Sequence, residues 1–409
     1  MPPPLTIAII GAGVGGPAAA IGLARNGHTV TLYERAPSIG GVGFAFRITP
    51  NADRCLKFLG IDAVAGGAVV ANWSRFMDSR GKVLREIREN AGPGGGGGGL
   101  SIFAYRLSLQ KQLLDEAARH GAQIRMGVEV TSVDVSSCTI EFADGTTSTV
   151  DLIIGADGVH SCIRPHVIDG SIHFPRASTG HSCLRATISK QDILDDPMAS
   201  HVINDEFPLV GWRNAEKVIV CYVVDNGRQA NMVCTHPEAL SSRETSSGDD
   251  ADKTGYNQRI TLDAARDIYQ DFDPVAVRLL ELADPDGFRV WKLMDMDNIP
   301  RWSAGNVVLL GDACHPVLPY GFSGASMAIE DAVTLTALLP SDVELAQIQD
   351  RLQLYERIRK PRVQRVRDES RTWSSGVRDA EGWKRYIGFL NSHDAVKYAE
   401  QELKKHQGS

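Results

Sequence analysis

Residues 11–16 (Gly-Ala-Gly-Val-Gly-Gly) constrain the fold of this chain more than any other feature of its sequence. They follow residues 5–10, a short apolar run rich in β-branched side chains, and precede residues 17–25, which are good helix formers. Residues 28–33 have the pattern of a second strand, with Glu34 at its end. A strand, a glycine-rich turn, a helix and a second strand in this order predict a parallel βαβ unit that binds a dinucleotide.

Each glycine of this turn has a distinct expected role. Gly11 permits the tight turn, Gly13 lets a pyrophosphate approach the backbone, and Gly16 lets helix and strand pack closely. The phosphates are expected at the unpaired N–H groups of the helix N-terminus. Glu34, 18 residues after Gly16, can accept hydrogen bonds from the hydroxyls of an adenosine ribose. Since a carboxylate repels a 2′-phosphate, the resident nucleotide is expected to be NAD or FAD rather than NADP.

Two later segments repeat the pattern of a buried strand followed by a glycine and an acid. Residues 150–154 lead into Gly155-Ala-Asp157-Gly158, and residues 305–310 lead into Gly311-Asp312, ahead of a helix predicted over 327–339. An acid just past a strand, with glycine-rich backbone at a helix start, suits a polyol and a polar ring edge. Asp312 is therefore expected to accept hydrogen bonds from ribityl hydroxyls. The amides near Gly324 and Ala325 are expected to face the oxygens of a pyrimidine ring.

Together, the three motifs resemble those of FAD-dependent aromatic hydroxylases, the single-component flavoprotein monooxygenases of the para-hydroxybenzoate hydroxylase and salicylate hydroxylase type. The likeness covers roughly residues 5–375. It implies that Asp157 belongs to a motif shared between FAD and an incoming nicotinamide cofactor, and that Asp312 holds the riboflavin half. It also assigns cofactor contacts to further positions, namely Arg35 beside Glu34, Gly43 and Ala45 close to the flavin, and Arg106 at the FAD pyrophosphate or ribose.

The resemblance further implies a reaction. NADH or NADPH, with NADPH favoured, reduces the FAD, and the reduced flavin and O2 form a C4a-hydroperoxide that hydroxylates an electron-rich aromatic or heteroaromatic molecule, in secondary metabolism or aromatic catabolism. Alternatives on the same fold are an epoxidase of an indole or alkene and a flavin oxidase that does not hydroxylate. A redox-sensing flavoprotein without catalysis is an alternative of another class. The second and third motifs disfavour an NAD-dependent dehydrogenase.

The expected fold class is α/β, with a Rossmann-like FAD-binding βαβ domain, a second and mostly antiparallel β-sheet lobe, and a helical C-terminus. Residues 1–165 and 290–345 are assigned to a discontinuous FAD-binding domain. Residues 166–289 are assigned to the substrate lobe, because segments such as 181–188, 209–213 and 218–224 alternate as antiparallel strands do. Residues 346–409 are assigned to a C-terminal helical segment.

Two residues of the middle segment are candidates for catalysis. Arg185 interrupts an apolar strand, where an unpaired guanidinium is costly, so it is expected to face a pocket or an acid. By resemblance, an arginine on this strand binds or polarises a phenolate or carbonyl oxygen. Tyr222 is expected to face the same cavity, the alternative being a buried core tyrosine. Arg47 points either toward the ring or into solvent. His315 lacks the second and third ligands that a metal site needs, so no metal is expected.

The bulk composition excludes several kinds of partner. A net charge of −7 argues against nucleic-acid binding, and residues 357–371, basic at helical spacing, are interpreted as a solvated helix face that partners acidic neighbours. Seven scattered cysteines without a C-x-x-C pair indicate reduced thiols and a cytoplasmic protein. No run reaches the ~18 apolar residues of a membrane span. The oligomeric state is expected to be monomer or homodimer.

Overall fold

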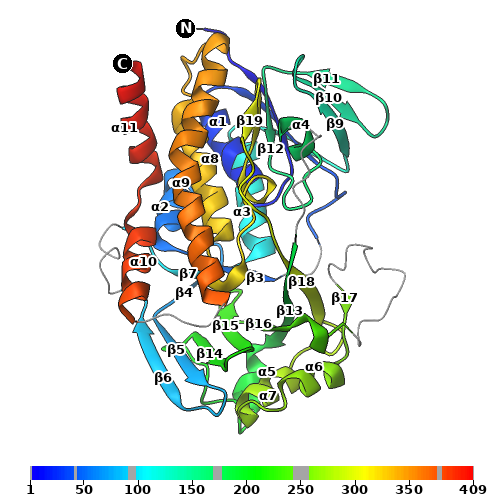
Figure 1. The fold of residues 1–409 in the computed structure, drawn as a ribbon, viewed down its shortest axis with the longest axis vertical. Coiled ribbons are helices and arrows are strands. Elements are labelled where there is room, and N and C mark those ends of the chain that lie inside the picture. The colour runs from blue at the N-terminus through cyan, green and yellow to red at the C-terminus, as the bar shows by residue number, and fades with distance from the viewer. Residues whose placement is uncertain are drawn as a thin grey trace.

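The computed structural model describes residues 2–40, 44–90, 98–168, 177–242, 258–374 and 380–408 of the 409. A parallel sheet surrounded by helices occupies one end of the molecule, a mostly antiparallel sheet occupies the other, and C-terminal helices run along one side (Figure 1). The expected α/β fold class, with its Rossmann-like sheet, second antiparallel sheet and helical C-terminus, is confirmed.

The first sheet has six strands in the order β19-β20-β12-β1-β2-β8. Their bounds are Ser303–Ala304 (β19), Val307–Leu309 (β20), Leu152–Gly155 (β12), Thr6–Ile10 (β1), Thr29–Glu34 (β2) and Gln123–Met126 (β8). All neighbours pair in parallel except β19, which is antiparallel to β20. Strands β12 and β20 are buried throughout and β1 nearly so, which explains their uninterrupted apolar sequences.

Because β1, β12 and β20 are adjacent and parallel, the three glycine-bearing turns that follow them meet at one edge of the sheet. The Ala156 N–H donates to the Ile10 carbonyl at 2.8 Å, and the Leu310 N–H donates to the Gly155 carbonyl at 2.9 Å. The helices around this sheet are α1 (Gly15–Arg25), α2 (Pro50–Phe58), α3 (Arg106–Arg119), α4 (Arg164–Ile168) and α8 (Gly324–Leu338). Segments roughly 150 residues apart in sequence thus form one site at the carboxyl ends of parallel strands.

The second sheet has eight strands in the order β17-β18-β13-β16-β15-β14-β5-β6. Their bounds are Gln258–Arg259 (β17), Arg289–Asp295 (β18), Ala177–Ser189 (β13), Gln229–Pro237 (β16), Val218–Val224 (β15), Leu209–Arg213 (β14), Trp73–Asp78 (β5) and Val83–Arg88 (β6). All neighbours are antiparallel except β14 and β5, which are parallel. Smaller sheets are formed by β3 (Ala45–Ile48), β7 (Ile102–Tyr105) and β4 (Val69–Val70), and by β9 (Val130–Asp134), β10 (Thr139–Phe142) and β11 (Thr147–Thr149).

The two faces of the eight-stranded sheet have different partners. Leu184 and Ala186 of β13 belong to a core shared with α5 (Lys190–Asp195), α6 (Leu262–Tyr269) and α7 (Pro274–Glu281). The alternating residues, represented by Cys183 and Tyr222, pack instead with β3 and β7 on the opposite face. This second face looks toward the glycine-bearing turns.

The eight-stranded sheet combines segments that the sequence assigned to different domains. Strands β5 and β6 come from within residues 1–165, and nearly all of β18 lies in the first residues of 290–345. The division of the chain into 1–165 with 290–345, 166–289 and 346–409 stays a prediction.

The C-terminal helices are α9 (Ile348–Ser374), α10 (Ala380–Ser392) and α11 (Ala395–Gln407). The expected acidic neighbours of residues 357–371 are present, but the expectation that this helix face is solvated is wrong for three arginines, Arg359, Arg362 and Arg367, which are 2%, 7% and 3% exposed. A run of basic residues at helical spacing indicates a surface helix only when no buried acids face it. Here two do.

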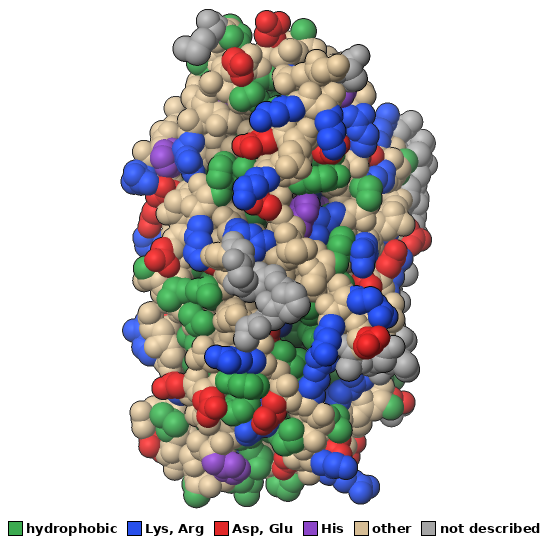
Figure 2. Space-filling view, turned by 90° about the vertical axis from the view of Figure 1, so that its left-hand side faces the viewer, with side chains coloured by type: hydrophobic (Ala, Val, Ile, Leu, Met, Phe, Trp, Pro, Cys, Tyr) green, Lys and Arg blue, Asp and Glu red, His purple; other side chains and the backbone are tan. Residues whose placement is uncertain are grey.

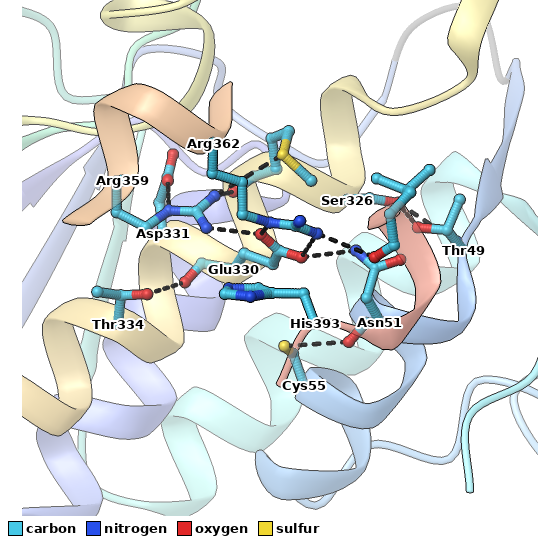
Figure 3. A network of polar contacts seen from close by, with 12 residues as sticks. Thr49, Asn51, Cys55, Ser326, Glu330, Asp331, Thr334, Arg359, Arg362 and His393 are labelled. Atoms are coloured by element: carbon cyan, nitrogen blue, oxygen red, sulfur yellow. Dashed lines mark hydrogen bonds and ion pairs between the residues drawn. The ribbon is translucent and has the colours of Figure 1, made fainter. Parts of the chain in front are cut away.

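Glu330 and Asp331 of α8 are the buried acids that α9 faces (Figure 3). Arg359 donates to Glu330 at 2.6 Å and to Asp331 at 2.7 Å, and Arg362 donates twice to Glu330, both at 2.7 Å. Asn51 of α2 adds a third donor to Glu330, at 2.6 Å. Burial raises the pKa of both carboxyl groups, but the facing guanidiniums outweigh it for Glu330, and His315 and Arg359 outweigh it for Asp331.

The surface of the molecule carries mixed charge. On the face formed by α10, α11 and β6, basic and acidic side chains are interspersed (Figure 2). All seven cysteines are unpaired. Within the described part of the chain, no helix is both long enough and apolar enough to span a membrane.

Removing one guanidinium from the buried network should destabilise the protein strongly. Arg359→Met leaves the carboxylates of Glu330 and Asp331 buried with too little positive charge, so the free energy of unfolding should fall by about 3–5 kcal/mol in urea denaturation. Arg357→Met is the matched control, because Arg357 is exposed on the same helix; its change should stay within about 0.5 kcal/mol. Equal effects of the two substitutions would contradict the network's role.

Stability should fall as the pH drops from 6.5 toward 4. Burial lowers the pKa of His236 and His393 to about 4, from 6.5 in the unfolded chain. Between these values the unfolded chain binds two protons that the folded chain does not, so acidification favours unfolding by on the order of 1–3 kcal/mol per histidine. Urea denaturation at saturating FAD should show a flatter pH dependence for His236→Gln/His393→Gln. The exposed His201, changed to Gln, should leave the slope as it is.

Candidate active site

A cavity of about 520 Å³ lies where the three glycine-bearing turns meet. The predicted site residues that line it are Gly13, Arg35, Ala45, Arg106, Asp157, Arg185, Tyr222, Asp312, Gly324 and Ala325. Gly11, Gly16 and Glu34 are not among its lining residues, and Gly43 lies outside the described residues. The cavity therefore collects residues from every motif that the sequence singled out.

The first turn is built so that only one of its glycines faces open space. Gly11 has φ +107°, and a Cβ there would lie 2.4 Å from the Ala156 carbonyl oxygen. A Cβ on Gly16 would lie 2.0 Å from the Gly11 oxygen. A Cβ on Gly13 would meet nothing within 4 Å, because this position opens on the cavity. The backbone at Gly13 thus leaves the room that a pyrophosphate needs at the start of α1.

Glu34 is oriented by backbone donors at the end of β2. Its Oε2 accepts from the Ala12 N–H at 2.8 Å and its Oε1 accepts from the Ala36 N–H at 2.9 Å. A carboxylate offers about four acceptor positions, so capacity remains for two ribose hydroxyls. Arg35 and Arg106, both exposed, bring positive charge to the lining of the cavity.

Asp157 lines the cavity and has one buried oxygen without a partner among the described residues. Its Oδ2 accepts from the backbone N–H groups of Cys162 and Ile163, at 2.8 and 3.2 Å. Its Oδ1 is buried and has no partner among the described residues. Since a buried unpaired oxygen costs free energy, a ligand O–H or N–H is the expected partner.

The third motif brings an acid and a helix N-terminus together. Asp312, in the 3-10 turn η3 (Gly311–Ala313), is solvent-accessible through the cavity that it lines. The protein around the cavity desolvates its carboxylate, and this raises its pKa, with His315 opposing and Asp331 adding to the rise. Helix α8 starts beside it at Gly324, and Ser323 makes no capping hydrogen bond. The first N–H groups of α8 therefore remain for a ligand at the cavity wall.

The backbone of Ala45 is held by side chains of the second sheet. The Tyr222 hydroxyl donates to the Ala45 carbonyl at 2.7 Å, and Arg185 Nη1 donates to it at 3.4 Å. The Ala45 N–H donates to Asn231 Oδ1 at 3.3 Å. Burial raises the pKa of Tyr222 well above its usual value, so the hydroxyl stays protonated and committed to this bond.

Arg185 lies across the cavity from the glycine-bearing turns. Its guanidinium sits over the rings of Phe44 and Trp291, at 5.4 and 5.0 Å from their centroids. Its Nε is buried without a hydrogen-bond partner among the described residues. Arg185 lines the cavity, and no ion pair to it is found among the described residues, so of the two expected neighbours, a pocket or an acid, it has the pocket.

The two positions that the sequence left open are both buried. Arg47 does not point into solvent: it donates to Glu89 at 2.5 Å and to Ser101 at 2.8 Å. His315 Nε2 lies 2.5 Å from Asp331 Oδ2, and its ring packs on Trp302.

The expectation that His315 has no second and third ligand nearby is wrong, because Cys314 and Asp331 lie close enough to it to offer them. Asp331 already accepts from the Gly311 N–H and from Arg359. Burial raises the pKa of the Cys314 thiol well above its ordinary value, and the thiol donates to the Gly311 carbonyl at 3.3 Å. A protonated thiol and a carboxylate with its acceptors in use make a poor metal site.

A second cavity, of about 360 Å³, adjoins the first and shares Val233, Pro319 and Phe322 with it. Its walls include the aromatic side chains of Phe76, Trp212, Tyr320, Phe322 and Trp383. Phe322 adopts a left-handed backbone conformation, with φ +52°, which is unusual for a residue with a Cβ and typical of strained functional segments. A flat apolar molecule would fit here against the contents of the first cavity.

The residues of the first cavity fit FAD. They supply a carboxylate for a ribose, an open glycine backbone for the pyrophosphate, an unpartnered Asp157 oxygen, and Asp312 beside a helix N-terminus for the polyol and ring edge. Fold and site together define a flavin-dependent oxidoreductase.

Comparison with known proteins supports the assignment to flavin-dependent enzymes. A family model described as an FAD binding domain matches residues 5–370. Hispidin-3-hydroxylase of Neonothopanus nambi is 31% identical over 389 residues, covering 90% of this chain and 87% of that protein. The 3-hydroxybenzoate 6-hydroxylase of Klebsiella oxytoca is 30% identical, covering 88% of this chain and 85% of that protein. The structure of CtdE in complex with FAD and a substrate matches with a TM-score of 0.82 at 22% identity, over 98% of both chains.

The chain therefore belongs to this FAD-binding-domain family and is an FAD-dependent monooxygenase. The expectations of FAD as cofactor and of a hydroxylase-type flavoenzyme are confirmed.

Sequence reasoning missed several residues of the two cavities. Two of them, Glu89 and Phe322, line the second cavity. The third, Asn231, accepts a hydrogen bond from Ala45 of β3. Asn231 carried a usable signal, because an amide inside an apolar strand needs a buried partner just as Arg185 does. Glu89 and Phe322 carried none, since the first reads as a strand-end acid and the second as a loop aromatic.

A methyl group at Gly13 should weaken FAD binding without harming the fold. Gly13→Ala meets no protein atom within 4 Å, so the stability of the FAD-free protein should change by less than about 0.5 kcal/mol. The dissociation constant for FAD, measured by flavin fluorescence quenching, should rise about tenfold or more because the methyl occupies the phosphate's approach. Gly388→Ala, equally open but on α10, should leave FAD binding unchanged. Unaltered FAD affinity in Gly13→Ala would place the pyrophosphate elsewhere.

Proposed function

We propose that this monooxygenase uses NAD(P)H and O2 to hydroxylate an electron-rich aromatic or heteroaromatic small molecule held in the second cavity. The observation that carries the proposal is the direct contact of an aromatic-walled cavity with the FAD-fitting cavity, through Val233, Pro319 and Phe322. The named relatives, which act on hispidin and 3-hydroxybenzoate, support an aromatic substrate.

The cofactor, when bound, supplies the chemistry that activates O2 and transfers its oxygen. We infer that the chain contributes binding and orientation. Gly13 and the N-terminus of α1 would hold the pyrophosphate, with Arg106 and Arg35 beside it. Glu34 would hold the adenosine ribose and Asp312 the polyol. The N–H groups of Gly324 and Ala325 would meet the ring edge, while aromatic walls exclude water from the substrate.

Arg185 is assigned a catalytic role in this proposal. Its guanidinium, free of ion pairs among the described residues, lines the flavin cavity on the side of the second sheet. A positive charge there would stabilise the deprotonated, more nucleophilic form of a substrate hydroxyl. Tyr222 would act by fixing the Ala45 carbonyl, which Arg185 also contacts.

The described residues form one dinucleotide-binding sheet, and FAD would occupy its site, so the nicotinamide cofactor would bind transiently across the FAD domain. NADPH is the favoured reductant. A cytoplasmic location and a monomeric or homodimeric state stay predictions.

Incubation with ¹⁸O2, NADPH and a panel of phenols, anthranilates, quinazolinones and indoles should yield a product that carries one labelled oxygen. Arg185→Gln should keep its FAD and lower the rate of product formation by about 100-fold, because the preorganised positive charge that Arg185 places in the flavin cavity is lost. Arg259→Gln, exposed on β17, is the control and should behave as wild type. Epoxide products would identify the enzyme as an epoxidase. Peroxide without labelled product from any compound would contradict hydroxylation and identify an oxidase.

A further inference from the structure

The second cavity contains a single carboxylate among the described residues that line it, Glu89. The other charged lining residues are arginines, namely Arg47, Arg85 and Arg213. Most of the remaining wall is aromatic or aliphatic. An acid in such surroundings is an exception that calls for a physical reason, because buried charges are costly unless they are paired.

Glu89 is held in a fixed orientation by partners from other segments. Its Oε2 accepts from Arg47 of β3 at 2.5 Å, and its Oε1 accepts from the Ser74 hydroxyl of β5 at 2.6 Å. Arg47 is fixed in turn by donating from Nε to Ser101, just before β7, at 2.8 Å. The side chains of Arg47 and Glu89 are only 7% and 6% exposed. This is a built polar site in the wall of an apolar cavity.

The site has acceptor capacity to spare. An ionised carboxylate offers about four acceptor positions, and Arg47 and Ser74 use two of them. A carboxylate in an ion pair has no proton to donate, so it can recognise only a donor, such as a hydroxyl or a ring N–H. An ether or a methylated nitrogen at the same place would leave the remaining positions unfilled and desolvated.

The position of Glu89 relates it to the reacting ring. Its partner Arg47 lies two residues after Ala45 on the same strand, and Ala45 lines the FAD-fitting cavity. A ring that donates to Glu89 is therefore anchored at a fixed place relative to that cavity. Which ring carbon faces the flavin then depends on where the ring carries its donor group.

We propose that Glu89 is the specificity-determining residue of the second cavity. It accepts a hydrogen bond from a hydroxyl or ring N–H of the aromatic substrate and so selects hydroxylated arenes and N–H heteroarenes over their O-methyl and N-methyl analogues. The assignment rests on the proposed function, since it presumes that the second cavity holds the substrate.

The test removes the proposed hydrogen bond in two ways, by replacing the acceptor Glu89 and by methylating the donor of the ligand. The FAD-loaded enzyme is titrated with the best phenol or lactam from the ¹⁸O2 panel and with its O- or N-methyl analogue, and binding is followed by the change in flavin absorbance. Glu89→Gln should raise the dissociation constant of the donor-bearing ligand about 10- to 100-fold and leave that of the methyl analogue within about twofold. It should also divert consumed NADPH from product to peroxide, because a ring that is no longer anchored is hydroxylated less often.

Two further variants make the comparison specific. Glu86→Gln removes an acid from β6, the strand just before Glu89, where Glu86 pairs with Arg75 at the surface, and should match wild type in every readout. Glu89→Gln leaves the Arg47 guanidinium buried without its ion pair, which could cost the enzyme its FAD. The double variant Arg47→Gln/Glu89→Gln removes both buried charges and replaces the single variant in that case. The double variant should lose the same preference for donor-bearing ligands.

The outcomes separate this assignment from the proposed function. An unchanged dissociation constant in Glu89→Gln, or equal weakening of the donor-bearing ligand and its methyl analogue, overturns the role of Glu89 while hydroxylation by the wild type still stands. Tight binding that depends on Glu89, without labelled oxygen in any product, overturns the proposed function and leaves the role of Glu89 standing.

Discussion

Two adjacent carboxylates, Glu330 and Asp331, lie fully buried in α8 and are neutralised by guanidiniums of α9 (Figure 3). Each carboxylate also fixes something else. Asp331 accepts from the Gly311 N–H, so it sets the turn that carries Asp312, and Glu330 accepts from Asn51 at the start of α2. Since an unpaired charge here would cost several kcal/mol, these contacts disfavour arrangements of α2, α8, α9 and the third glycine-bearing turn that separate the partners. The FAD-fitting cavity inherits its shape from the arrangement that keeps them together.

The nucleotide half of the molecule could be predicted from the sequence because its signals are local. Gly11, Gly16 and Glu34 act through the backbone within one βαβ unit, where spacing along the chain fixes position in space. The second sheet could be predicted as a class for a similar reason, since alternation of apolar residues reports strands directly. Arg185 could be singled out on similarly local grounds. A guanidinium inside an apolar strand is costly unless it contacts a polar group or an open cavity, wherever the strand lies.

The remainder depended on pairings between distant segments. Glu89 pairs with Arg47, 42 residues away in the sequence, and Glu330 pairs with Arg362, 32 residues away. The residues around each partner therefore give no indication of the other. The same absence explains why α9 was mistaken for a solvated helix: helical spacing of arginines is identical whether water or buried acids face them. Strand β5 joins β14 in parallel, a pairing between residues about 135 apart that local periodicity cannot specify.

Strand β3 connects the second sheet, the Glu89 ion pair and helix α8. On one side Tyr222 and Asn231 hold its Ala45 backbone, and on the other the Glu89 ion pair holds Arg47. Just beyond its end, Thr49 donates to Ser326 in the first turn of α8, the helix that carries Glu330 and Asp331 (Figure 3). A four-residue strand fixed at three places cannot shift at one cavity without shifting at the other. Under the proposed function, substrate orientation and flavin position would be coupled through this strand, so that changes in the polar wall of the second cavity should alter the efficiency of oxygen transfer as well as affinity.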